Sequence, residues 1–448
     1  MAKKTEAQGF RGYFEWFFRS EVTGSILLLI CTIAALVWAN SPWANVYHDL
    51  LHTYIGVGWG DTVFKLNLHH WINDGLMVVF FFVVGLEVKR ELVVGELSSF
   101  EKASLPVAAA LGGMVVPAVL YAVLNVDGAG ARGWGIPMAT DIAFALGVLA
   151  IFGKRVPLGL KVFLTALAIA DDLGAVAVIA LFYTEQINFG VLAIAAVSLA
   201  VLYPVVRMRV KHRGIVLILM VVVWLDIFAS GIHPTIAGIL LAMVIPVRPM
   251  VDPKQFVSDA EAVLENLKKR QESDSCVITD REQLYALEYV HTGAGDALPA
   301  GLMLEQSLHP VQVWLILPLF ALANAGVAID SHILSALANP ISIGIILGLA
   351  VGKPLGILAM AWIAVKARLC RLPTGVTWSQ VFGVGCLAGI GFTMSLFITD
   401  LAFDNEAVID SAKLGILIAS LLSAVVGAAI LSRSLPRDPG RDPAASEG

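Results

Sequence analysis

The sequence predicts an all-α polytopic membrane protein with about 12 transmembrane helices, forming a single domain over residues 1–448. Three observations predict this class: little charge, many long apolar segments, and basic residues that alternate between the loops. Of the 448 residues, 58% are hydrophobic and only 15% are Asp, Glu, Lys or Arg, whereas a soluble domain averages about 25% charged residues. The composition excludes an ordinary soluble enzyme, and the net charge of -5 predicts no nucleic-acid partner.

Twelve apolar segments are candidates to cross the lipid bilayer. A helix needs about 20 predominantly apolar residues to cross a hydrocarbon core that is about 30 Å thick. The segments at 214–225 and 231–247 are short, so one re-entrant hairpin is an alternative for that pair. In chain order the twelve segments are 22–39, 68–86, 103–126, 133–153, 158–183, 188–206, 214–225, 231–247, 307–329, 339–365, 376–399 and 406–432.

The basic residues support twelve spans and predict their orientation. Lys and Arg in short loops favour the cytoplasmic side. With the N-terminus inside, the inside segments hold 26 of the 30 basic residues, and the outside loops hold only Lys65 and Arg132. We therefore expect a multi-pass protein of the bacterial inner membrane with both termini in the cytoplasm. Lys413 lies seven residues into the last segment, and we expect its side chain to reach the outer interface.

Three segments are not predicted to cross the membrane. Residues 52–68 hold glycines between short β-prone stretches, which predicts a small extracytoplasmic β-hairpin that needs a partner for stability. Residues 252–300 form a cytoplasmic insertion with 10 acidic and 5 basic residues. We expect two short amphipathic helices in it, around 260–270 and 281–289, and assign it no chemistry. Residues 434–448 are expected to form a disordered cytoplasmic tail.

Four ionisable residues stand out inside apolar segments, where a charge is costly and marks a candidate functional site. Each is 10 to 13 residues from a Lys that marks the cytoplasmic end of its span, which is about 15–20 Å along a helix. Half of the hydrocarbon core is about 15 Å thick. The four residues, which come from three spans, are therefore predicted to lie near one level at mid-membrane. They are Asp141, Asp171, Asp172 and Lys353.

A static ion pair between Lys353 and one aspartate is one interpretation of these charges. It would leave two carboxylates without a cation, and the adjacent Asp171 and Asp172 point about 100° apart on a helix. Burial and like charge favour the protonated form of such a carboxyl group, while its ionised form is a hard oxygen ligand for a small cation. A site that holds either protons or a metal cation is the minimum machinery for cation/proton exchange.

Helix-breaking residues point to the same region. Two glycines and Pro137 precede Thr140 and Asp141, and four closely spaced glycines lie in the segment 376–399. Close helix packing is one explanation of glycine-rich spans. Paired interrupted helices are also the sequence pointer to the ion site of a transporter, because unwound backbone must line a cavity or be covered by protein. We expect two interrupted helices, with the Thr140 hydroxyl and free carbonyl groups nearby as further oxygen ligands.

Charged residues at the ends of spans are candidates for a gate or a pH sensor. An interfacial charge cluster is the alternative for Glu87, Arg90 and Glu91, and a structural role is the alternative for His309 at the start of the ninth span. A histidine at the outer end of the eighth segment is either a structural residue or a switch. These candidates are Glu87, Arg90, Glu91, Glu305, His309 and His233.

Seven motifs resemble those of the bacterial NhaA family of sodium/proton antiporters. They follow one another in the family's order from the second span to the eleventh, and together they are highly specific. They are GLEVKREL at 85–92, IPMATDIAFALG at 136–147, ADDLGA at 170–175, SGIH at 230–233, LPLFALANAG at 317–326, GKPLG at 352–356 and GIGFTMS at 389–395.

The resemblance implies an inverted repeat of spans 3–5 against 10–12, with broken spans four and eleven crossing at mid-membrane; the family is a known case of such a repeat. It implies a transporter without a cofactor, which exchanges Na⁺ or Li⁺ electrogenically for protons and is regulated by pH. Asp141 and Asp172 would carry the cation or protons near Thr140, and Asp171 would pair with Lys353. The other candidates except His233 would serve pH activation, and the outer hairpin would join a homodimer.

Other classes of function remain open from the residues alone. A sodium-coupled organic-solute symporter on a similar fold would need a wide polar pocket, but few polar residues remain beyond the ion site. An intramembrane aspartyl protease needs two carboxylates on separate helices, and Asp141 with Asp171 could fill that role. The Gly-x-Gly-Asp pattern expected around one of them is absent, however, and Lys353 would have no purpose. A channel would not need carboxylates that must protonate.

Overall fold

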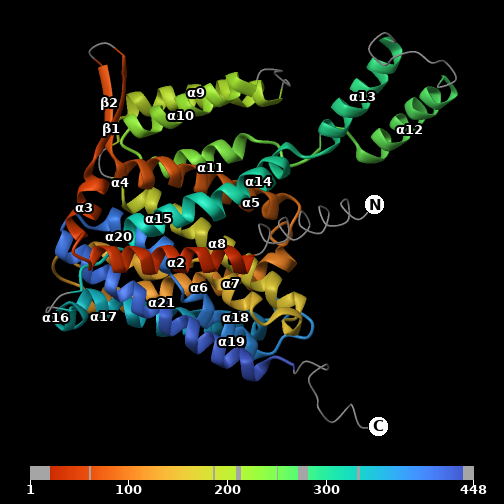
Figure 1. Ribbon diagram of the computed structural model, residues 1–448. Coiled ribbons are helices and arrows are strands. Elements are labelled where there is room, and N and C mark those ends of the chain that lie inside the picture. Colours follow the sequence, from red (N-terminus) through yellow and green to blue (C-terminus); the bar gives the residue numbers. More distant parts are fainter. Residues whose placement is uncertain are drawn as a thin grey trace, which may run out of the picture.

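The computed structural model describes residues 21–59, 62–184, 187–207, 213–249, 251–270, 281–329 and 333–436. This part of the chain is an all-α membrane protein with one two-stranded sheet (Figure 1). Within it, nine helices are long and apolar enough to cross a membrane, a bent pair makes a tenth candidate span, and two apolar helices are shorter. These elements follow the twelve predicted segments in order. The predicted basic residues before position 21 and most of the predicted tail lie outside the described residues.

Most spans are continuous helices, although three of them change to π-helical geometry part-way. A π-helical turn inside an α-helix is rare and often occurs at a functional site. The uninterrupted helices are α2 (Glu21–Ala39), α6 (Phe100–Leu124), α8 (Leu158–Phe182), α9 (Phe189–Arg207) and α21 (Glu406–Ser434). The spans with a π segment are α4 (Leu68–His70), η1 (Trp71–Leu76) and α5 (Met77–Val93); α14 (Ala300–Val311), η4 (Gln312–Ile316) and α15 (Leu317–Asn324); and α17 (Pro340–Leu347), η5 (Gly348–Gly352) and α18 (Lys353–Lys366).

Two spans are broken, as predicted, and their breaks meet. The fourth span consists of the 3₁₀ helix η2 (Ala131–Met138) and α7 (Ile142–Ala150). The eleventh consists of α19 (Trp378–Ala388) and α20 (Phe392–Ala402), which bend by 45°. The N–H of Asp141 donates to the carbonyl of Ile390 over 2.7 Å. Each break therefore helps to satisfy the backbone of the other, as buried irregular backbone in a membrane requires.

The remaining elements are shorter. The predicted hairpin is present: β1 (Tyr54–Trp59) pairs antiparallel with β2 (Thr62–Asn67), with Tyr54 opposite Asn67, and it projects from the helical body (Figure 1). The insertion folds into two helices that are longer than predicted and also project (Figure 1). The ninth span starts at Ala300 rather than at 307. The other elements are α3 (Ala44–His52), η3 (Gly153–Arg155), α10 (Arg213–Ala229), α11 (Thr235–Val244), α12 (Pro253–Arg270), α13 (Arg281–Ala297) and α16 (Ile333–Leu337).

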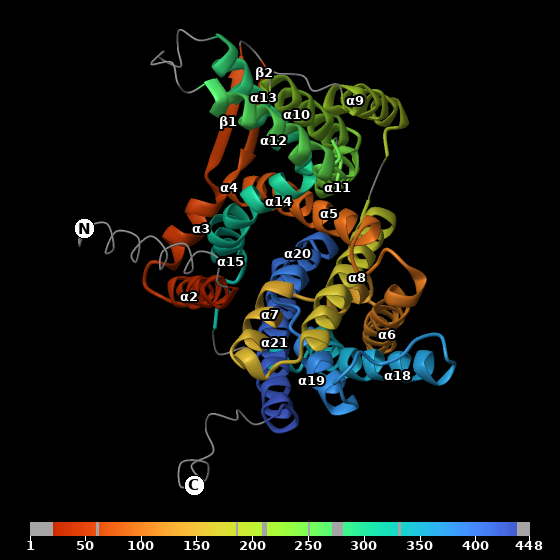
Figure 2. The same ribbon diagram turned by 90° about the vertical axis from the view of Figure 1, so that its right-hand side faces the viewer.

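Two groups of helices are visible in Figure 2. We call η2, α6, α7, α8, α17, η5, α18, α19, α20 and α21 the core group, and α4, η1, α5, α9, α10, α11, α14, η4 and α15 the panel group. Glycines allow close helix contact in both. A Cβ atom added to Gly112 of α6 would lie 2.1 Å from the carbonyl oxygen of Gly356 on α18, and one added to Gly238 of α11 would lie 2.3 Å from that of Val78 on α5. Any larger residue at either position would therefore clash with the backbone of the neighbouring helix. The core group unites the third to fifth spans with the tenth to twelfth, and each triple has a broken helix in the middle.

Candidate ion site

A buried ion pair joins three helices of the core group. The Nζ atom of Lys353, the first residue after the π segment η5, lies 2.9 Å from Oδ2 of Asp171 on α8, and both side chains are fully buried. Lys353 also donates to the carbonyl of Met138 at the end of η2. The Thr140 hydroxyl lies 2.7 Å from the same Asp171 oxygen and 2.9 Å from the carbonyl of Ala388. The pair thus fixes the break in the fourth span against α8, α18 and α19.

Asp141 lies where the two broken helices begin their second halves. It is the N-cap of α7, and its Oδ1 accepts the N–H of Phe144 at 3.0 Å. Its Oδ2 accepts both the N–H of Thr393 at 3.1 Å and its hydroxyl at 2.5 Å. Since Thr393 is in the first turn of α20, the carboxylate faces the positive dipole ends of two half-helices. Opposed helix N-termini balance the negative charge of Asp141 without a basic side chain.

Asp172 differs from its neighbour in the groups that it meets. It lines a cavity of about 240 Å³ together with Asp141, Thr393 and Glu87. Its Oδ1 atom, like that of Asp171, is buried and has no hydrogen-bond partner among the described residues. A buried carboxylate oxygen without a protein partner is suited to bind an ion or a proton. Two carboxylates facing one small cavity suit a hard cation or a proton.

The candidate pH sensors divide between two places. Glu87, Glu305 and His309 line the cavity that holds Asp172. Arg90 connects to this group through ion pairs with Glu305 at 3.1 Å and Glu91 at 2.8 Å. These five residues therefore form one cluster between α5 and α14, which we call the entrance cluster. His233 is separate: it lines a second cavity, where its Nε2 lies 3.6 Å from Asp74.

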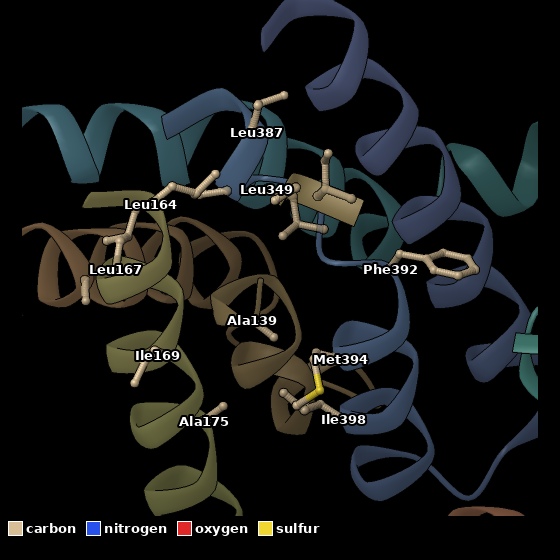
Figure 3. Close-up of a cluster of buried hydrophobic side chains, with 14 of the residues drawn as sticks. Ala139, Leu164, Leu167, Ile169, Ala175, Leu349, Leu387, Phe392, Met394 and Ile398 are labelled. Atoms are coloured by element: carbon tan, nitrogen blue, oxygen red, sulfur yellow. The ribbon is translucent and has the colours of Figure 1, made fainter. Parts of the chain in front are cut away.

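Apolar side chains surround the point where the helices break. Figure 3 shows Leu164 and Leu167 on α8, Leu349 of η5 and Leu387 of α19 close to the break, with Phe392 and Met394 on α20. All six are buried or nearly so. Water is largely excluded from these surroundings, so the electrostatic interactions of the aspartates are stronger than they would be in water.

One expectation about a polar group was wrong in this conformation. Lys413 does not reach the outer interface: it is 8% exposed, and its Nζ lies 3.7 Å from Oδ1 of Asp400. A part-buried carboxylate on the neighbouring helix offers it a closer partner than the interface does. Near Thr140, the carbonyl groups of Met138, Ala388 and Ile390 each accept one hydrogen bond, and a second lone pair on each oxygen remains for a further donor or a cation.

Thr393 was missed as a site residue. Within the glycine-rich eleventh span, the signal was its position two residues after Gly391, in the first turn of a second half-helix whose N–H groups have no partner inside the helix. The break itself is predictable from the glycines, whereas the group that the new helix N-terminus faces depends on the packing of the fourth span against the eleventh.

Broken helices that cross beside buried carboxylates define a secondary ion transporter. Comparison with known families makes this class specific. The sequence profile of the family described as Na⁺/H⁺ antiporter 1 matches residues 15–431, so the chain belongs to this family. It is a family of multi-pass membrane transporters and not of enzymes, which excludes the protease alternative, and the symporter alternative finds no support.

Relatives match the chain over nearly its full length. It is 47% identical over 425 residues to the Na⁺/H⁺ antiporter NhaA 2 of Syntrophotalea carbinolica, covering 95% of this chain and 97% of the relative. It is 46% identical over 430 residues to the Na⁺/H⁺ antiporter NhaA of Oleidesulfovibrio alaskensis, covering 96% and 95%. It is 43% identical over 417 residues to the Na⁺/H⁺ antiporter NhaA 2 of Helicobacter hepaticus, covering 93% and 94%.

Proposed function

We propose that this protein exports Na⁺ or Li⁺ in exchange for external protons. The observation that carries the proposal is the pair of carboxylates, Asp141 and Asp172, in one buried cavity, where Asp172 has an oxygen without a partner. A cation needs both carboxylates ionised, whereas protons neutralise them. The two ions therefore compete for the same oxygen atoms, and this competition couples their movements.

The position of the cavity indicates to which side of the membrane the ion site is open. It reaches from the aspartates to Glu305 and His309, which lie on the side that the basic residues predict to be cytoplasmic. We infer an inward-facing conformation, with both termini in the cytoplasm and the protein in the bacterial inner membrane. Na⁺ enters from this side, and the core group then rocks against the panel group to release it outside. Protons bind there and return the site inward.

Charge movement follows from the number of carboxyl groups. If Asp141 and Asp172 release a single Na⁺ and each take up a proton, one net positive charge enters per cycle, so exchange is electrogenic. Lys353 and Asp171 lie beside them as an ion pair, and we expect Asp171 to change its protonation state during the cycle. The entrance cluster, through which the cation passes, is where we place pH activation.

Proton release in proteoliposomes tests this function. The purified protein is reconstituted with a pH-sensitive dye inside, and NaCl, LiCl or choline chloride is added across a range of pH, with and without a membrane potential. We expect Na⁺ and Li⁺ to move protons, choline to have no effect, and the potential to change the rate. If adding the cation moves no protons and the protein takes up an organic solute in a Na⁺-dependent manner, the function is that of a symporter and not of an antiporter.

We further propose that the protein is a homodimer joined through residues 52–68. The support is the hairpin itself: two strands alone are marginally stable, and their outer edges have unpaired backbone groups that can pair with another chain. Tyr54 and Ile55 on β1 are 62% and 47% exposed, which is unfavourable unless a partner covers them.

Deleting the hairpin is expected to produce monomers. Residues 55–66 are replaced by a short Gly/Ser linker, and the mass in detergent is measured by light scattering. We expect a dimer for the full chain, a monomer for the deletion, and retained Na⁺-dependent proton movement, because the hairpin does not contact the ion site. A dimer that survives the deletion would place the interface elsewhere.

A further inference from the structure

A buried polar network joins the core group to the panel group at the end of the molecule away from the entrance cluster. Oδ2 of Asp400, on α20, accepts a hydrogen bond from Nδ2 of Asn73, on η1, at 2.9 Å. Asn324, the last residue of α15, donates to Oδ1 of Asn73 at 2.9 Å. Asn73 is 7% exposed and Asn324 is fully buried. These bonds connect one broken helix of the core group to two spans on the other side.

Two basic side chains face Asp400 from other helices. Lys413 of α21 lies 3.7 Å from its Oδ1, and His69 of α4 lies 3.7 Å from its Oδ2. His69 also lies 2.9 Å from the amide oxygen of Asn324. Asp400 thus has partners on three elements, and its shortest contact, with Asn73, crosses between the groups. Hydrogen bonds to an ionised group are the stronger class.

The same helix connects this network to the ion site. Thr393, which holds Asp141, precedes Asp400 by seven residues on α20, which is about 10 Å or two turns. Because α20 is one continuous helix, a displacement of its outer end is transmitted to Thr393. The position of Asp400 is therefore coupled to the position of the Asp141 carboxylate.

Phe397, between these two residues, closes the outer path. Its ring lies 5.6 Å from that of Phe81, 6.3 Å from that of Phe320 and 5.4 Å from that of His233, measured between ring centres. An outer cavity of about 740 Å³ ends at Phe397 and is lined by His69, Asn73 and Asp400. None of the four mid-membrane charges borders that cavity. Opening the ion site outward requires the core group to move Phe397 past its neighbours on α5, α15 and the segment before α11.

We propose that Asp400 is a positioning residue that holds α20 to η1 and α15 in the inward-facing state and releases them when the site turns outward. The inference rests on the proposed antiport function. The motion that frees Phe397 separates α20 from η1, so the bond between Asp400 and Asn73 cannot persist in the outward-facing state. The bond then stabilises one state only, and such a contact shifts the balance between states.

Measurements of the apparent Na⁺ affinity from each side of the membrane test the proposal. With Asp400→Ala, the loss of a hydrogen bond to a charged group is expected to raise the outward-facing population roughly tenfold. Apparent affinity scales with the fraction of binding-competent protein. We therefore expect the half-saturating Na⁺ concentration to fall about tenfold in right-side-out vesicles, with less than about a twofold change in everted vesicles. Asn73→Ala is expected to reproduce this asymmetry.

Three comparisons separate positioning from general damage. Asp400→Asn keeps an oxygen that can accept a hydrogen bond from Asn73. We expect its half-saturating Na⁺ concentrations, on both sides, to stay close to those of the natural protein. Asp226→Ala removes another intramembrane carboxylate, which accepts a hydrogen bond from Ser198 at 2.7 Å within the panel group. We expect this variant to change the half-saturating Na⁺ concentration by the same factor in both vesicle orientations. Labelling of Met394→Cys by an impermeant thiol reagent from outside, with the native cysteines replaced, is expected to rise when Asp400→Ala is added.

The outcomes separate the positioning role from the function. Equal changes at both faces, or the same asymmetry in Asp226→Ala, would overturn the role of Asp400 while leaving antiport intact. Absence of Na⁺-dependent proton movement in the natural protein would instead refute the proposed function.

Discussion

Asp172→Asn is expected to abolish Na⁺-dependent proton movement. The amide has nearly the same shape, but it neither ionises nor takes up a proton, so the competition between the two ions is lost. Losing a charged ligand worth about 3 kcal/mol also lowers cation affinity roughly 100-fold. In everted membrane vesicles, adding NaCl should cause no dequenching of a pH dye beyond that of vesicles without the protein.

The matched control is the same substitution at another intramembrane carboxylate. Asp226→Asn changes a residue of α10 that bonds to Ser198 of α9 and does not line the ion cavity. We expect this variant to retain the dequenching of the natural protein at equal expression. Normal dequenching in Asp172→Asn would show that the proton and the cation do not share this carboxylate.

The spans and the ion-site region could be predicted because the bilayer imposes simple rules on a sequence. Hydropathy depends on local composition, and the high cost of an intramembrane charge singles out residues such as Asp141 and Lys353. Helix ends were less predictable. The α5 helix runs on to Val93 and α14 starts at Ala300, since both helices continue beyond the purely apolar stretch with charged or polar residues in helical conformation.

The partners of polar residues could not be predicted from one sequence. Asp400 stands one residue beyond the predicted segment 376–399 and was not predicted as an intramembrane charge, and Lys413 was expected to reach the interface. The structure brings the two together, with the Lys413 and Asp400 side chains 10% and 13% exposed. Which charge meets which partner depends on how helices far apart in the chain pack, and hydropathy does not contain that information. The resemblance supplied the pairing of Asp171 with Lys353, but not the contact between Asp141 and Thr393.

Lys353→Ala is expected to destabilise the protein by about 3–5 kcal/mol, the usual effect of removing one member of a buried ion pair. The substitution leaves the Asp171 carboxylate buried without its cation and leaves the carbonyl of Met138 without a donor. The loss should appear as a lower midpoint of thermal unfolding in detergent, followed by fluorescence-detected size exclusion. Lys366→Ala on the same helix is the control, because its side chain is exposed and its ammonium group lies over the Trp362 ring, 4.4 Å from the ring centre; such an exposed contact contributes about 0.5–1 kcal/mol.

Removing both charges separates stability from transport. Replacing a buried pair with neutral side chains of similar volume is often neutral or stabilising, so Asp171→Asn with Lys353→Met should recover most of the lost stability. The amide at position 171 can still accept from the Thr140 hydroxyl. If the double variant is no more stable than Lys353→Ala, the damage comes from lost packing rather than from an unpaired charge. Because the double variant should stay folded, any change in the voltage dependence of its proton movement reports the role of this pair in the cycle itself.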